Sequence, residues 1–151
     1  MDFTGPLNMV SCLVAVICGF IIGFERQWNG KTAGIRTSIL ICLGACIFVS
    51  TGCYYWPEEG SVRIVGQIIT GVGFLGAGVI IARDGLVHGV TSAAVIWMLA
   101  AIGSLTGLQH NLPAIILACI TVVILVSITY LERSMSKLKR GVHRDTDRDE
   151  L

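Results

Sequence analysis

The sequence predicts an all-α integral membrane protein, a bundle of five transmembrane helices with a short charged tail. Of its 151 residues, 54% are hydrophobic and 14% are charged, and the mean hydropathy is +0.77. Soluble domains carry about 25% charged residues, so the bilayer is the main solvent of this chain. The charged residues also lie between long uncharged runs, and about 20 apolar residues are enough to cross a bilayer as a helix.

Each expected span is bounded by charged residues or by a break in the apolar pattern. The first run ends before Glu25, the second begins at Thr37, and the third lies between Arg63 and Arg83. The last 47 residues before the tail contain no Lys, Arg, Asp or Glu, and the glycine- and proline-bounded segment at 107–113 divides them into two helices. We expect a transmembrane domain over 1–131, with spans near 7–24, 37–56, 64–82, 90–106 and 112–131, and a charged cytoplasmic tail over 132–151.

The basic residues predict the orientation, because cytoplasmic loops of membrane proteins are enriched in Lys and Arg. With an outer N-terminus and an inner C-terminus, ten of the eleven basic residues lie on the cytoplasmic side. Only Arg63 then lies outside, beside two acidic residues at 58–59. We therefore predict an N-out, C-in topology.

The third expected span is unusually rich in glycine. Five of the nineteen residues between Arg63 and Arg83 are glycine. Small residues let helices approach closely in lipid, where no hydrophobic force drives association, so we expect this helix in the middle of the bundle. The Gly-x-Gly-x-x-Gly pattern at 71–76 matches a dinucleotide fingerprint, but no strand precedes it and it lies inside an apolar run. The predicted packing residues of this hub helix are Gly66, Gln67, Gly71, Gly73, Gly76 and Gly78, with Gln67 as a group that hydrogen-bonds between helices.

Four chain ends should meet at the inner membrane surface and bring polar side chains together. Basic residues there can be ordinary anchors, but acidic residues gain nothing from the positive-inside rule and need partners. We therefore expect Glu25 to pair with Arg36 or Arg26, and Asp84 to join the same group. The predicted polar cluster consists of Glu25, Arg26, Arg36, Thr37, Arg83, Asp84 and Thr91.

No pattern in the sequence indicates catalysis, a metal site or a cofactor. The three histidines are far apart in sequence, and no expected span has an acidic residue well inside it. The six cysteines form no Cys-x-x-Cys pair, and five lie in apolar runs, where a free thiol behaves as a small hydrophobic group. We expect a protein that is not an enzyme, with no cofactor, no metal ligands and no nucleic-acid partner.

Four ordered blocks of the sequence carry a resemblance to a known family. They are Gly23-Phe-Glu-Arg-Gln27, Ala33-Gly-Ile-Arg-Thr37, the stretch from Arg63 to Ile80, and the stretch from Gly89 to Gly103. Together they resemble the MgtC/SapB family over roughly residues 7–131. The resemblance implies a five-helix, multi-pass protein of the bacterial inner (plasma) membrane. The family's best-studied members also carry a cytoplasmic domain of the ACT type, which we expect this chain to lack.

The resemblance implies a role in magnesium homeostasis, in stress adaptation such as acid tolerance, or in inhibition of the proton-translocating ATP synthase. We favour a non-enzymatic regulator that uses small-residue helix faces to bind a membrane-protein partner or a second copy of the chain. The alternative is a small cation transporter or channel with Glu25 and Asp84 at its cytoplasmic mouth. A magnesium path usually offers several oxygen ligands, and the expected spans offer few.

Overall fold

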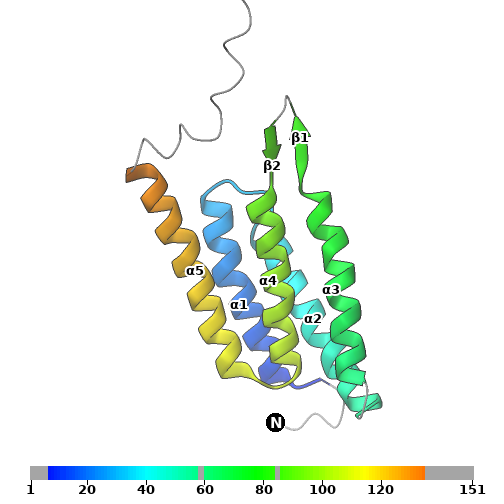
Figure 1. The fold of residues 1–151 in the computed structure, drawn as a ribbon. Helices are drawn as coiled ribbons and strands as arrows, with labels where there is room; N and C mark the ends of the chain where they lie inside the picture. Colours follow the sequence, from blue (N-terminus) through cyan, green and yellow to red (C-terminus); the bar gives the residue numbers. More distant parts are fainter. Residues whose placement is uncertain (1–6, 58–59, 84–85, 135–151) are drawn as a thin grey trace, which may run out of the picture.

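The computed structural model describes residues 7–57, 60–83 and 86–134. Over these ranges the chain forms five α-helices and one short β-hairpin (Figure 1). The all-α class and the expected five helices are thereby confirmed. The helices are α1 (Met9–Trp28), α2 (Ile35–Tyr55), α3 (Gly60–Gly78), α4 (Val90–Gly107) and α5 (Asn111–Ser134), and the strands β1 (Ile81–Arg83) and β2 (Leu86–His88) lie between α3 and α4.

Four of the helices, α1, α2, α4 and α5, are long and apolar enough to cross a membrane. The apolar part of α3, Val62–Gly78, is shorter than these four. The predicted break between the last two helices is present, with Gln109 in a left-handed conformation at φ 64°. Pro113 follows in the first turn of α5, where a helix does not need the missing backbone N–H.

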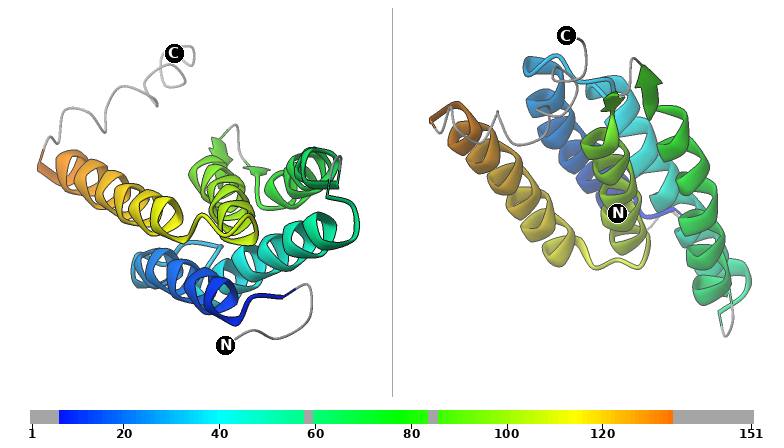
Figure 2. Two further views of the ribbon diagram at one scale, coloured as in Figure 1. Left: turned by 90° about the horizontal axis from the view of Figure 1, so that it is seen from below. Right: turned by 45° about the horizontal axis from the view of Figure 1, so that its top comes forward.

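The middle of the bundle is built by α1, α2 and α4, with α3 and α5 at opposite edges (Figure 2). α2 packs against both α1 and α4, α3 lies against α2 and α4, and α5 lies against α1 and α4. The core side chains are small or aliphatic, and the described residues of α3 contribute none of them. The core includes Ala15, Cys18, Ile22, Cys42, Cys46, Val95, Leu99, Ile102, Ala114 and Ala118.

Two glycines of α1, one turn apart, let this helix approach α2 closely. A Cβ atom at Gly19 would lie 2.8 Å from the Cα of Ile39, and one at Gly23 would lie 2.7 Å from the Cα of Ile35. Such distances leave no room for any side chain. Because lipid supplies no hydrophobic force between helices, this close contact stabilises the pair through van der Waals packing.

α4 approaches the other side of α2 in the same way. A Cβ atom at Gly103 would collide with the carbonyl oxygen of Cys42, and one at Gly107 would lie 2.7 Å from the carbonyl oxygen of Cys46. The hydroxyl of Ser50 donates a hydrogen bond of 3.2 Å to the carbonyl oxygen of Gly107. α2 is therefore the helix on which the bundle is centred.

The chain between α3 and α4 differs from the sequence expectation. The third helix ends at Gly78 instead of continuing to 82, and β1 pairs with β2 in antiparallel register, with Ile81 opposite His88. The spans expected near 64–82 and 90–106 leave only a short connection and no strand between them. The helix ends at a glycine that precedes three β-branched residues, and β-branched residues favour extended backbone. Gly89 closes the hairpin at φ 91°, where a Cβ atom would collide with the carbonyl oxygen of Val79.

The predicted place of the hub helix is wrong. α3 lies at an edge of the bundle, and a Cβ atom at Gly66, Gly71, Gly73 or Gly78 would meet nothing within 4 Å. Gly76 alone among these glycines contacts α4, with its Cβ position 3.6 Å from the Cβ of Ala93. Glycine content marks a helix that could accept close neighbours, but it does not say whether they come from the same chain.

Candidate functional site

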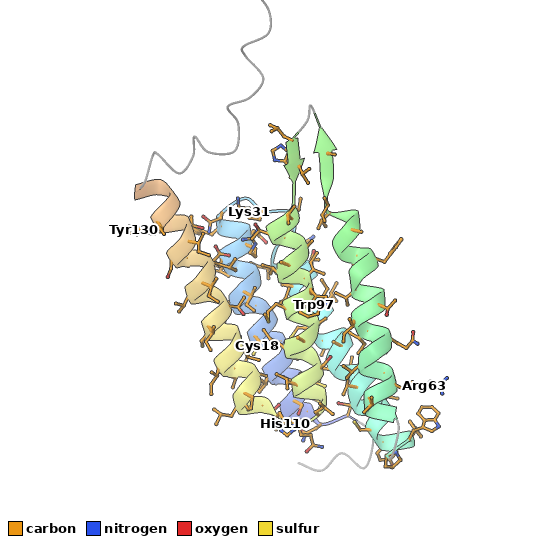
Figure 3. The ribbon with its side chains drawn as sticks, in the orientation of Figure 1. Cys18, Lys31, Arg63, Trp97, His110 and Tyr130 are labelled. Atoms are coloured by element: carbon orange, nitrogen blue, oxygen red, sulfur yellow. The ribbon has the colours of Figure 1, made fainter. Side chains whose placement is uncertain are left out.

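One end of the bundle gathers the segments that carry the predicted polar residues, and we call it the polar end. The last turn of α1, the connection with Lys31, the first turn of α2, the hairpin and the start of α4 lie here, as does Tyr130 of α5 (Figure 3). Arg63 and His110 lie at the opposite end (Figure 3). The helix ends expected on the cytoplasmic side lie together at one end of the bundle, while the membrane topology stays a prediction.

The centre of the polar end is a buried ion pair between two consecutive residues of α1. A guanidinium nitrogen of Arg26, Nη1, lies 3.7 Å from Oε2 of Glu25, and the two side chains are 4% and 7% exposed. Burying both charges has a desolvation cost that their attraction only partly offsets, whereas removing one partner strands the other. Of the two partners expected for Glu25, the structure thus selects Arg26.

Hydrogen bonds tie this pair to α4 and to the end of α1. Nη2 of Arg26 donates to the hydroxyl of Ser92 at 3.2 Å, in the first turn of α4. Nδ2 of Asn29 donates to Oε1 of Glu25 at 2.8 Å and to the backbone carbonyl of the same residue at 3.0 Å. Asn29 was missed in the predicted cluster, although its spacing of four residues from Glu25 on a helix could have revealed the contact.

Two atoms of the buried pair have no hydrogen-bond partner among the described residues. They are Oε2 of Glu25 and Nε of Arg26. A buried polar atom without a hydrogen bond is unfavourable by about 1–3 kcal/mol. Both atoms are enclosed and keep hydrogen-bonding capacity that no described residue uses.

Three other predicted members of the cluster do not join this pair. Arg36, Thr37 and Thr91 are exposed. Asp84 and the side chain of Arg83 lie outside the described residues. Helix ends that meet in space present side chains in several directions, and in the described part of the chain only Glu25, Arg26, Asn29 and Ser92 converge.

Two largely apolar grooves run along the outside of the central helices. One, of about 970 Å³, lies between α2 and α3 and is lined by Gly44, Phe48 and Gln67 among others. The second, of about 610 Å³, lies between α1 and α5 and reaches the polar end, where Glu25 and Asn29 line it. No group of three His, Cys, Asp or Glu side chains that could hold a metal ion occurs among the described residues.

A comparison with protein families shows the family to which the chain belongs. The family model described as "MgtC family" matches residues 12–134, which contain almost all of the five helices. The chain belongs to the MgtC family. The resemblance inferred from the four sequence blocks is thereby confirmed. The family and the four long apolar helices both indicate a membrane protein.

Curated members of the MgtC family match over the same region. "Protein MgtC" of Salmonella typhimurium (strain LT2) is 36% identical over 132 residues, which are 87% of this chain and 55% of that protein. "Putative magnesium transporter YhiD" of Escherichia coli (strain K12) is 44% identical over 103 residues, 63% of this chain and 47% of that protein. The chain spans about half the length of these relatives. No solved structure matches it.

Proposed function

We propose that this chain is a non-enzymatic inner-membrane protein that binds and regulates a larger membrane complex during magnesium limitation or acid stress. The proton-translocating ATP synthase is the complex we put forward. Membership of the MgtC family supports a role of this kind. The observation that carries the proposal, however, is the surface of α3.

A row of small residues runs along the side of α3 that points away from the bundle, beside the exposed Phe74, and we call this row the outer face of α3. Gly66, Thr70, Gly73 and Ala77 follow one another at helical spacing on it, and all four are exposed. A Cβ atom at Gly66 or Gly73 would meet no other atom within 4 Å. Small residues at this spacing are typical of contacts between transmembrane helices. No described helix of this chain covers the face, so we take its partner to be a helix of another membrane protein.

The polar residue Gln67 of α3 lies beside α2 and not on the outer face. Gln67 is exposed in the groove beside α2, and its amide makes no hydrogen bond to another described residue. The expected bond from Gln67 to a neighbouring helix is therefore not formed inside this bundle.

The test is capture of membrane partners after cross-linking in intact cells. We compare Gly73→Leu, on the outer face of α3, with Gly44→Leu, a control in α2 whose added Cβ also meets nothing within 4 Å. Gly73→Leu should abolish capture of ATP synthase subunits and the effect on ATP-driven proton pumping in inverted vesicles, while Gly44→Leu keeps both. Equal capture by the two variants would exclude the outer face as the docking surface, and capture of a different complex would exclude the ATP synthase.

Cation transport is the second candidate, and two observations favour it. One relative carries the name of a putative magnesium transporter. In addition, the carboxylate of Glu25 is buried at the polar end with one oxygen that accepts no hydrogen bond. Magnesium uptake into liposomes containing the purified protein, lost in Glu25→Gln, would support transport. No uptake above protein-free liposomes would exclude it.

A further inference from the structure

We propose that the groove between α1 and α5 binds one phosphatidylethanolamine molecule, with an acyl chain along the groove and the primary ammonium at Glu25. This lipid site is separate from the outer face of α3, and it holds whether the protein acts as a regulator or as a transporter. The shape of the groove, the polar atoms at its end and the charge at that end carry the proposal.

The groove has the form that an acyl chain needs. α5 leans away from α1 towards the polar end, and the second view shows the same divergence (Figures 1 and 2). The volume of the groove is about 610 Å³, and its walls are largely aromatic and aliphatic. They include Phe20 and Phe24 of α1 and Val122 and Val126 of α5. Apolar walls alone would accept any lipid, so the selectivity must come from the end of the groove.

The end of the groove has an unused hydrogen-bond acceptor. Glu25 lines the groove and is more than nine-tenths buried, and its Oε2 accepts no hydrogen bond. Its other oxygen already accepts from Asn29 at 2.8 Å. An ionised carboxylate has about four acceptor sites on its two oxygens, so the group can accept a donor from the groove while it keeps the bond from Asn29. The ion pair with Arg26, at 3.7 Å, leaves that oxygen without a hydrogen-bond donor.

A primary ammonium fits this acceptor better than the head groups of other common phospholipids. It donates up to three hydrogen bonds, and bonds to an ionised group are about twice as strong as neutral ones. A choline head group has no N–H to donate, and a glycerol head group has no positive charge. Lys31 is exposed at the same end of the bundle (Figure 3), where its positive charge complements the lipid phosphate.

Aromatic residues set the depth of the site. Trp28 and Tyr130 line the groove near Glu25, and Tyr130 lies at the polar end (Figure 3). Tryptophan and tyrosine are enriched where the apolar core of a membrane meets its head groups. The acceptor of Glu25 thus lies at the level at which a lipid ammonium is found.

Binding is measured by native mass spectrometry of the full chain released from detergent, with phosphatidylethanolamine, phosphatidylcholine and phosphatidylglycerol of identical acyl chains. We expect one phosphatidylethanolamine molecule per chain, bound about tenfold or more tightly than the other two lipids, as one charge-assisted hydrogen bond implies. Equal binding of the three lipids would overturn the proposal. Competition by soluble ethanolamine as strong as that by the lipid would show a site for a small amine and overturn it as well.

Two matched substitutions in α5 test the location. Val126→Trp fills the groove, whereas Val123→Trp adds the same bulk to an exposed position that does not line it. Val126→Trp should lose the tightly bound lipid, and Val123→Trp should keep it. Glu25→Gln should bind the three lipids equally. If Glu25→Gln does not accumulate because Arg26 is stranded, the two valine variants decide, and loss in both or in neither refutes the site.

Discussion

Replacing Gly23 by alanine should damage the bundle, whereas the same change at Gly73 should not. Both residues lie in apolar helices of this chain, and each has a small residue four positions away in the sequence, Gly19 and Ala77 respectively. Gly23 faces α2, and its missing side chain lets the two backbones touch. Gly73 lies on the outer face of α3, where no atom of the chain is within 4 Å of an added Cβ.

The size of the effect follows from these distances. A Cβ atom at Gly23 would lie 2.7 Å from the Cα of Ile35 and 2.9 Å from the Cβ of Ser38, so the helices must separate. Overpacking of this kind lowers the free energy of unfolding by about 1–3 kcal/mol. At Gly73 only helix propensity changes, and alanine is favoured over glycine by about 1 kcal/mol in water. Gly73→Ala should therefore leave stability unchanged or raise it slightly.

The assay is reversible unfolding in mixed micelles, in which the denaturing detergent is increased and helix content is followed by circular dichroism. Comparing midpoints at one protein concentration gives the two free-energy differences directly. If Gly73→Ala destabilised the monomer as much as Gly23→Ala, the glycines of α3 would be packing residues after all. An unchanged midpoint for Gly23→Ala would equally refute the close contact of α1 with α2.

Three further predictions concern the polar end, the hairpin and the topology. Glu25→Ala and Arg26→Ala should each lower the free energy of unfolding by about 3–5 kcal/mol. The double variant should lose less than the sum of the two single losses, and strictly additive losses would show that the two charges do not interact. Gly89→Ala should lower the local stability of the hairpin by about 1–3 kcal/mol, because Gly89 has a φ of 91° and an added Cβ would collide with the carbonyl oxygen of Val79. The backbone amides of β1 and β2 should then exchange hydrogen faster, and unchanged exchange would contradict the prediction. A cysteine placed at His143 in a cysteine-free chain should react with an impermeant thiol reagent only after the cells are opened, whereas reaction from outside would reverse the predicted topology.

Much of the fold follows from periodic and compositional patterns that lipid imposes on a sequence. Uncharged runs between charged residues located the first three helices, because a charge is expensive inside the bilayer, and the break at 107–113 separated the last two. These patterns did not predict which helices pack against one another. In the sequence Gly103 and Gly107 look like Gly66 and Gly73, since all four are glycines in apolar helices, yet only the first two face another described helix of this chain. Composition shows that a helix surface is smooth, but not which surface lies against it.

The candidate site, too, could be predicted from the sequence only in part. The need of a buried acid for a partner predicted that Glu25 would be paired, and it is paired with Arg26. The direction of each side chain at a helix end depends on a rotation that the sequence does not reveal, so Arg36 and Thr91 point away while Ser92 points inward. The hairpin was missed because an Asp-Gly pair flanked by three-residue strands is a short signal beside nineteen apolar residues.

The position of α2 between two glycine-bearing helices has a consequence for how the chain is inserted during synthesis. The contact with α1 can form as soon as α2 is made, because both partners are adjacent in sequence. The contact with α4 must wait until α3 and the hairpin have been synthesised. During that interval the surface of α2 formed by Cys42, Ala45 and Cys46 has no partner from its own chain. α3 must therefore settle against a different side of α2, and the groove beside Gly44 is the side that it takes.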